Sequence, residues 1–310
     1  MDADGAVTAA DLDDLFQRCS NWGRWGDRDT RGALNFIDQP RVVSAASLVR
    51  TGTVVSCSRP LASEPAIDNP GPPLHYMTDL PDDLPEGDLT GVAADFLGME
   101  CHGEVHSHID ALCHIAYRGQ LYNGWPAGSV TVAGASVCHL GELDRGIISR
   151  GVLLDVAAVR GARWLTGGEV IGPQDLDEAE AAAGLAVGTG DIVLLRTGHA
   201  LRRQVAGPWD SAHEKAGLHP RAMPWLKDRE IAALGFDGDG DAAPHACDGI
   251  RFPIHVLGIT AMGLHFFDAL GLEDLAAECA RQQRAEFLFA AMPLRADGAT
   301  GCAINPVAMF

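Results

Sequence analysis

The stretch 102-HGEVHSHIDALCH-114 decides how this chain can fold, because it gathers four histidines, a glutamate and an aspartate within thirteen residues. All six of these side chains fall on even-numbered positions, and the odd positions are small or apolar. Side chains alternate between the two faces of a β-strand. The pattern therefore predicts a strand with one face in the core and the other lining a polar cavity. A helix fits less well, because ligands spaced four apart drift by about 120° over three steps.

The polar face of this predicted strand has the chemistry of a metal site. His108 and Asp110 lie two residues apart and can share an ion, and neutral imidazole with carboxylate suits Zn or Mn. A bridging carboxylate would allow two ions about 3.5–4 Å apart. His114, farther along the same face, is placed to move protons. The alternative is an exposed polar strand of structural histidines, and clustering on one face favours the metal site.

The sequence on both sides of this stretch predicts a mixed α/β domain. Apolar runs predict buried strands, and amphipathic or capped segments predict helices between them. We expect strands at 52–57, 152–159, 192–198, 231–238 and 285–294, and helices at 9–18, 39–50, 174–185, 222–230 and 272–283. Neither an internal repeat nor a clear linker interrupts the chain. A single α/β domain over residues 1–310 is therefore expected.

A long segment at 59–91, rich in Pro, Asp and Gly, is expected to be a loop or an excursion from the domain. Loops of this length in compact domains are usually functional or disordered. We expect this loop and the N-terminal segment 1–50 to border the active site. Aromatic side chains on such loops either form the walls of a substrate pocket or anchor the loops to the core. The candidates for substrate contact are Trp22, Trp25, Asn35, His75 and Tyr76.

Charge and composition exclude several classes of protein. The net charge of −19 argues against nucleic acid and anionic membrane surfaces as partners. We expect no transmembrane helix, since no run of about 18 apolar residues occurs, and the acidic N-terminus does not resemble a secretory signal. The eight cysteines are scattered and form no CxxC pair, so we expect reduced thiols in a cytoplasmic protein.

The run 237-DGDGD-241 resembles the start of a calcium-binding EF-hand loop. The glycine that such a loop needs at its sixth position is replaced by Ala242. We therefore expect either a turn after the strand or a position near the active site.

The segment 104-EVHSHIDALCH-114 resembles, without gaps, the H-x-G-T-H-x-D-x-P-x-H motif of the metal-dependent cyclase family that includes bacterial kynurenine formamidase and isatin hydrolase. The resemblance implies that His108 and Asp110 are metal ligands and that His114 is the catalytic acid and base. Glu104 stands at the first histidine of the motif, and a carboxylate is still a competent ligand. The alternative ligands are His102 and His106. Ser107 and Leu112 are further departures from the motif.

The resemblance extends over most of the chain, through NWGRWGDRDTRGALNFI, PPLHYMT, YNG, GVLLDV, GDIVLLRTG and INPVAMF. In the family, a downstream histidine and glutamate complete a second metal site, and His255 and Asp268 occupy comparable places here. The resemblance implies an α/β fold with a swivelling β/β/α core, one or two Zn or Mn ions, and a homodimer or homotetramer.

Three functions are compatible with these features. The first is a metal-dependent hydrolase that uses metal-activated water on a carbonyl C–N or C–O bond of a small, aromatic molecule, such as a cyclic amide, a lactone or an N-formyl compound. The second is a polyketide-type cyclase or dehydratase. The third is a binding protein on a decayed enzyme scaffold, which the loss of the first motif histidine motivates.

Overall fold

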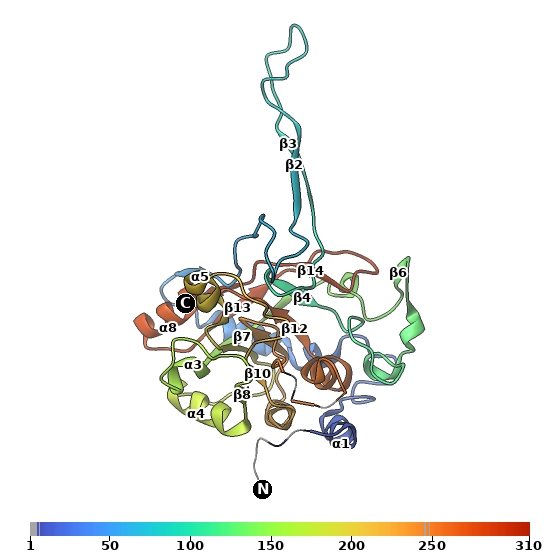
Figure 1. Ribbon diagram of the computed structural model, residues 1–310, viewed down its shortest axis with the longest axis vertical. Coiled ribbons are helices and arrows are strands. Elements are labelled where there is room, and N and C mark those ends of the chain that lie inside the picture. Colours follow the sequence, from blue (N-terminus) through green and yellow to red (C-terminus); the bar gives the residue numbers. More distant parts are fainter. Residues whose placement is uncertain (1–4, 6, 245, 248) are drawn as a thin grey trace.

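A curled nine-stranded sheet forms the centre of the computed structural model, which describes residues 5, 7–244, 246–247 and 249–310 (Figure 1). The strands lie in the order β1 (Val54–Ser56), β15 (Val307–Met309), β13 (Glu286–Ala291), β7 (Ile147–Asp155), β9 (Ile192–Arg196), β11 (Ala233–Phe236), β12 (His265–Asp268), β4 (His108–Asp110) and β14 (Gly301–Ala303). The four strands from β7 to β12 run parallel, and the strands outside them are antiparallel to their neighbours. The prediction of a single compact α/β domain is confirmed.

Helices and short two-stranded ribbons surround this sheet. The α-helices are α1 (Ala9–Cys19), α2 (Gln39–Ala46), α3 (Val156–Val159), α4 (Pro173–Ala183), α5 (His199–Ala206), α6 (Met223–Asp228), α7 (Pro253–His255) and α8 (Glu273–Gln282). The 3₁₀ helices are η1 (Gly32–Phe36), η2 (Tyr122–Gly124), η3 (Ala127–Ser129), η4 (Leu140–Glu142) and η5 (Pro220–Ala222), and η6 (Val256–Met262) is a π-helix. The ribbons pair β2 (Leu74–Asp79) with β3 (Ala94–Gly98), β5 (Val130–Thr131) with β6 (Gly134–Ala135), and β8 (Val170–Ile171) with β10 (Gly217–Leu218). No helix within the described ranges is long and apolar enough to cross a membrane.

The helix ends follow from local sequence. A capping box of Thr8 and Asp11 starts α1, since the side chain of each accepts a hydrogen bond from the backbone N–H of the other. Pro173 opens α4, and Gly184 ends it at a φ of 68°, a conformation that glycine adopts without strain. All five predicted helices are present, although α2 ends at Ala46, before the predicted end at residue 50.

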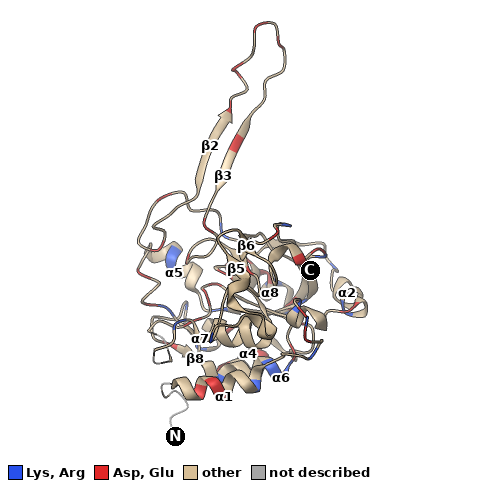
Figure 2. Cartoon of the chain, turned by 90° about the vertical axis from the view of Figure 1, so that its right-hand side faces the viewer, with Lys and Arg blue, Asp and Glu red and all other residues tan. Residues whose placement is uncertain are grey.

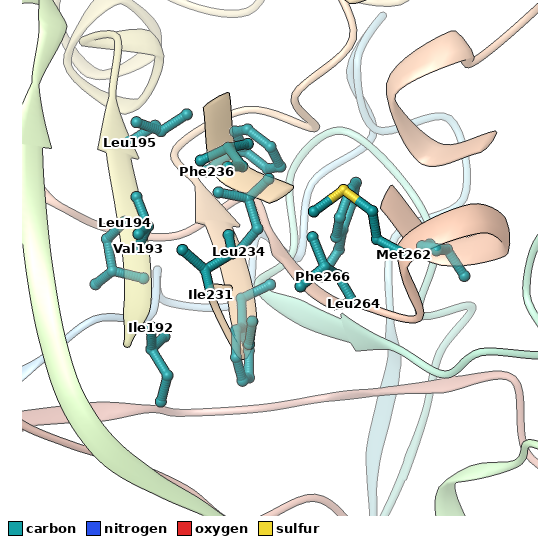
Figure 3. Packing of buried hydrophobic residues seen from close by; sticks show 14 of the residues in the cluster. Ile192, Val193, Leu194, Leu195, Ile231, Leu234, Phe236, Met262, Leu264 and Phe266 are labelled. Atoms are coloured by element: carbon teal, nitrogen blue, oxygen red, sulfur yellow. The ribbon is translucent and has the colours of Figure 1, made fainter. Parts of the chain in front are cut away.

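The core lies around the parallel strands. Every residue of β9 is buried, as expected for a central parallel strand that is covered on both faces. Figure 3 shows the β9 side chains beside Leu234 and Phe236 of β11, with Phe266 of β12 on the other side of β11. Phe266 belongs to this core, and β12 pairs directly with β4, the strand that carries His108 and Asp110.

Three predictions about secondary structure were wrong. The strand expected over 102–114 is only β4, because the chain bends before residue 108 and turns after residue 110, where His114 N–H donates to the Ala111 carbonyl. Residues 156–159 form α3 and not a strand, because Asp155 caps their backbone. The segment 59–91 is not all loop, because β2 lies within it.

The ribbon of β2 and β3, with the turn that joins them, projects far from the rest of the molecule (Figures 1 and 2). We call residues 74–98 the arm. Its two strands pair only with each other, in a two-stranded sheet of their own. The arm returns to the domain at Gly98, four residues before His102.

Candidate metal centre

Strand pairing brings the first candidate ligands together. Strand β4 lies antiparallel to β12, with His108 opposite Asp268 and Asp110 opposite Phe266. Because β4 alternates, His108 and Asp110 share one face, and Ile109 is buried in the core on the other face. His108 Nε2 lies 3.6 Å from Asp110 Oδ1 and 4.0 Å from Asp268 Oδ2.

Three more histidines reach the same point from outside the strand. His102 Nδ1 lies 2.9 Å from Asp110 Oδ1, and His114 Nε2 lies 3.9 Å from Asp110 Oδ2. The rings of His102 and His114 stack in parallel, with centroids 3.7 Å apart. His255 Nε2 lies 3.6 Å from Asp110 Oδ2 and 3.2 Å from Asp268 Oδ2. Asp110 is therefore the centre of a cluster drawn from β4, β12, α7 and two loops.

The donor atoms of this cluster form two overlapping groups, each with its atoms within 4.8 Å of one another. One group is His102, His108 and Asp110, and the other is Asp110, His255 and Asp268. Both oxygens of Asp110, Oδ1 of Asp268 and Nδ1 of His102 are buried without a well-aligned hydrogen bond to any described residue. Buried polar atoms without partners are costly. A divalent cation would satisfy these atoms, so the residues fit the metal that the sequence predicts.

Polar groups outside the cluster fix which nitrogen each imidazole presents to it. The Nδ1 atom of His108 lies 2.7 Å from the backbone oxygen of His106, which leaves Nε2 facing the cluster. His102 has its Nε2 atom 3.0 Å from Thr300 Oγ1, which leaves Nδ1 facing inward. Second contacts of this kind orient metal-binding histidines in proteins.

Asp241 holds His255 in place through both its side chain and its backbone. Its Oδ2 lies 2.6 Å from His255 Nδ1, and its Oδ1 accepts a hydrogen bond from the backbone N–H of Ile254 at 2.8 Å. Asp241 therefore caps the start of α7 and orients the ring at the end of that helix. A π-helix follows at once, and π-helical turns are frequent at functional sites.

The environment sets the charge of the cluster. Burial lowers the pKa of His108, and it lowers the pKa of His114 to about 4. Burial alone would raise the pKa of Asp110, but the positive charge available on His114 and the close contacts with His102 and His255 hold it well below 3.8. For His255, burial is outweighed by the carboxylates of Asp110, Asp241 and Asp268, which raise its pKa well above 6.5. The ionised carboxylate of Asp110 thus faces the neutral imidazoles of His108 and His114, which are forms that bind metal. His255 is protonated in the absence of metal and must lose a proton before it can bind one.

A cavity of about 250 Å³ opens onto the cluster. Ile115 and Phe252 supply apolar wall, and Glu104 and Asp239 supply a polar wall. The buried ammonium of Lys215 bridges the two carboxylates, with Nζ at 2.6 Å from Glu104 Oε1 and in contact with Asp239. Glu104 is therefore engaged by Lys215 and lies outside both donor groups.

His106, the other alternative ligand, is turned away from the cluster. Its Nε2 lies 3.2 Å from Asn69 Oδ1, in the segment 59–91. His106 precedes β4, where the chain has already left the strand, so strand alternation no longer applies to it.

The candidates for substrate contact in the N-terminal segment pack within the chain. The indole of Trp22 donates to the Thr260 carbonyl at 2.7 Å, and Trp25 meets Phe36 edge to face. Asn35 donates to a carboxylate and a carbonyl within the same segment. Residues 1–4 and 6 of the predicted segment 1–50 lie outside the described residues.

His75 and Tyr76 lie on the arm. His75 Nε2 is 2.7 Å from Asp95 Oδ2, and Tyr76 stacks on Phe96 with ring centroids 5.2 Å apart. The described lining of the cavity contains none of the five predicted contact residues. Substrate contact by these five residues stays a prediction. The position of segments 1–50 and 59–91 at the border of the active site also stays a prediction.

The run 237–241 contributes more than the sequence indicated. Asp237 accepts hydrogen bonds from the backbone at the start of α5, Asp239 contacts Lys215, and Asp241 orients His255. The run follows the carboxyl end of β11, a parallel strand, and ligand sites lie at such ends in α/β sheets. This position after a parallel strand could have identified Asp239 and Asp241 as site residues from the sequence. No comparable feature of the sequence identified Lys215.

The whole chain resembles known proteins in sequence and in fold. Residues 43–240, more than half of the chain, match a family model described as "Putative cyclase", and no curated protein matches. A crystal structure described as a novel cyclase is 30% identical, with a TM-score of 0.84 over 94% of this chain and 99% of that chain. The chain therefore belongs to this cyclase family.

More distant structures share the fold. An isatin hydrolase bound to the product analogue thioisatinate is 19% identical, with a TM-score of 0.59 over 88% of this chain and 98% of that chain. A predicted metal-dependent hydrolase from Bacillus stearothermophilus is 17% identical, with a TM-score of 0.51 over 84% of this chain and 98% of that chain. The predicted family resemblance and fold class are both confirmed.

Proposed function

We propose that this member of the cyclase family is a metal-dependent hydrolase that cleaves a carbonyl C–N or C–O bond of a small molecule. The observation that carries the proposal is the environment of Asp110. Its carboxylate is fully buried, has no well-aligned hydrogen bond from a described residue, and is surrounded by four imidazoles and the carboxylate of Asp268. A buried ionised carboxylate needs a compensating positive charge. The protonated ring of His255 supplies that charge in the absence of metal, and a bound divalent cation would supply it once the ring is neutral.

The residues that would hold the metal follow from the two donor groups. His102, His108 and Asp110 would hold one Zn or Mn ion, and Asp110, His255 and Asp268 would hold a second, with Asp110 shared. Such ions supply a Lewis acid for a carbonyl oxygen and lower the pKa of water. Glu104 would act from beside this set, where Lys215 fixes its carboxylate.

His114 is the residue that we propose to move the proton. Its side chain is 24% exposed and lines the cavity, so it can reach a bound molecule. Because burial lowers its pKa to about 4, the ring is neutral near pH 7 and can accept a proton at Nε2. The parallel stack on His102 fixes the plane of that ring. His114 Nε2 would take a proton from the attacking water and return it to the leaving nitrogen or oxygen.

The cavity limits the size of the substrate. A volume of about 250 Å³ suits a small molecule, and the side chains of Phe252 and Ile115 offer a flat or aromatic substrate an apolar surface. A cyclic amide, a lactone or an N-formyl aromatic compound would fit these walls. The shared fold with an isatin hydrolase supports this class of bond.

The alternative is a polyketide-type cyclase or dehydratase. The 30% identical structure described as a cyclase supports this alternative. The two reactions differ in their products, since hydrolysis releases a new carboxylate and cyclisation or dehydration does not. A binding protein without catalytic activity is the third candidate, and it would form no product at all.

The test is a substrate panel that contains isatin, an N-formyl anilide and an aromatic lactone. We expect the wild type to release a carboxylate from at least one of them. The variant His114→Gln should be slower by roughly 10²–10⁴-fold, the usual contribution of a general acid and base. The control is His213→Gln, at a ring that is 82% exposed, and it should keep full activity. Full activity in His114→Gln, or a cyclised or dehydrated product, would contradict the proposal.

A further inference from the structure

Lys215 is a charged residue buried beside the metal centre, and the proposed reaction gives it no step. Its side chain is 2% exposed. The ammonium Nζ lies 2.6 Å from Glu104 Oε1 and also contacts Asp239. Burial alone would lower the pKa of Lys215, but the carboxylates of Asp239 and Glu104 raise it above 10.5. The side chain is therefore charged at neutral pH, and a buried charge of this kind needs partners.

The two carboxylates that hold this ammonium lie on the two chain segments that build the cluster. Glu104 lies two residues after His102, which belongs to one donor group. Asp239 lies two residues before Asp241, and its Oδ1 accepts a hydrogen bond from the backbone N–H of Asp241 at 3.1 Å. Asp241 in turn holds His255, which belongs to the other donor group. The ammonium thus joins the supports of both donor groups.

The segment 101–106 has no regular backbone pairing to hold it in place. It belongs to no strand or helix, and within the part of the chain that the structure describes it makes no hydrogen bond between backbone groups. Contacts that involve side chains must therefore fix its position. The Arg59 guanidinium makes one such contact, since it donates to the Glu104 carbonyl at 3.4 Å and also to the Asp237 carbonyl. Arg59 and Lys215 thus tie this segment to the same neighbouring run.

We propose that Lys215 is a positioning residue of the metal centre. Its ammonium holds the segment of His102 and the run of Asp241 at the spacing that allows both donor groups to share Asp110. An ammonium suits this role, because it carries three donors and forms strong hydrogen bonds to carboxylates. The inference rests on the proposed function, since it requires a metal at this site.

The test must break this bridge without changing the charge near the ions. Removing Lys215 alone would also remove a positive charge, and that loss by itself strengthens cation binding. Two double variants avoid this effect, Lys215→Met with Glu104→Gln and Lys215→Met with Asp239→Asn, because each removes one basic and one acidic side chain. The control is Lys227→Met, at a partly buried lysine that also donates to two oxygens but lies outside the described lining of the cavity.

Competition with a chelating dye gives the Zn affinity of each full-length protein, and urea unfolding of the metal-free proteins gives their stability. We expect both double variants to bind Zn at least about tenfold more weakly than the wild type. Lys227→Met should lose stability and keep the wild-type affinity for Zn. The absorption spectrum of the Co(II)-loaded protein reports ligand geometry, so it should change in both double variants and not in the control.

Wild-type Zn affinity in either double variant would overturn the role of Lys215 and leave the proposed function intact. An equal weakening in Lys227→Met would also overturn it, because a general loss of stability would then explain the result. Failure of both double variants to fold without metal would overturn a role confined to the metal centre. A wild type that binds no Zn would contradict the proposed function itself and this inference with it.

Discussion

The metal centre and the arm are neighbours in sequence, with only four residues from Gly98 to His102, and they differ in physical character. Each holds a histidine paired with an aspartate, His255 with Asp241 at 2.6 Å and His75 with Asp95 at 2.7 Å. The first pair is buried and tied to the cluster, and the second is more than half exposed. The difference shows that the same two side chains join a buried cluster of metal-capable groups only where several elements converge and exclude water.

The largest effect is expected from removing the charge at the centre of the cluster. Asp110→Asn should lower hydrolysis by about a thousandfold or more, since the variant loses the shared ligand and with it several kcal/mol of transition-state stabilisation. The measurement is kcat/KM on the best substrate of the panel. Asp88→Asn makes the same change on the arm and should leave the activity unaltered. More than a tenth of wild-type activity in Asp110→Asn would show that this carboxylate is not needed for hydrolysis.

A pH effect on stability is expected from His265, which is fully buried on β12 and whose pKa burial lowers to about 3. The unfolded chain takes up this proton near pH 6.5, and the folded chain does not until near pH 3. Stability must therefore fall as the pH drops through this window. From pH 6.5 to 4.5 the loss attributable to His265 is about 2 kcal/mol.

Urea unfolding of His265→Gln at both pH values checks this expectation. The variant cannot take up the proton, so its free energy of unfolding should fall by about 2 kcal/mol less than that of the wild type. Equal pH dependence in His265→Gln would mean that the folded chain also protonates this ring.

The two histidine–aspartate pairs allow the sharpest matched comparison. Asp241→Asn should weaken metal affinity by roughly 10–100-fold, because His255 loses the charged partner that orients its ring. Asp95→Asn changes the equivalent partner of His75 and should leave metal affinity unchanged. Competition with a chelating dye measures both affinities. Equal affinities in the two variants would show that Asp241 does not support the metal centre.

The smallest effect is expected at the arm surface. Leu89 is 98% exposed, so Leu89→Ser should change the free energy of unfolding by less than about 0.5 kcal/mol at concentrations where the chain is monomeric. Urea unfolding of the dilute protein measures the change. A loss above about 1 kcal/mol would indicate that the arm packs against its own chain.

The sequence was sufficient to predict that His108 and Asp110 lie together, because alternation holds across the three residues of β4. The same alternation failed for His106 and Glu104, because the chain bends before the strand starts. Bends of this kind depend on which neighbouring strands are available, and β4 pairs with β12 and β14 over three residues only. The local sequence pattern does not show over how many residues a strand will pair.

The arm could not be predicted for a related reason. Pro, Asp and Gly dominate the segment 59–91, so its composition is that of a loop, and β2 and β3 are separated by a long turn. A hairpin whose strands pair only with each other has no buried face. Its sequence therefore shows no alternation of apolar and polar residues that would predict strands. The place of the run 237–241 after a predicted strand indicated a position near the active site, but the pairing of Asp241 with His255 was hidden, because the contact spans fourteen residues.

The most direct test is the metal content of untagged protein, measured by elemental mass spectrometry. We expect at least one equivalent of Zn or Mn per chain, and loss of that metal in His108→Ala. A ratio near two would support both donor groups around Asp110. Protein that is free of metal, and stays so after incubation with Zn and Mn, would contradict a metal centre around Asp110.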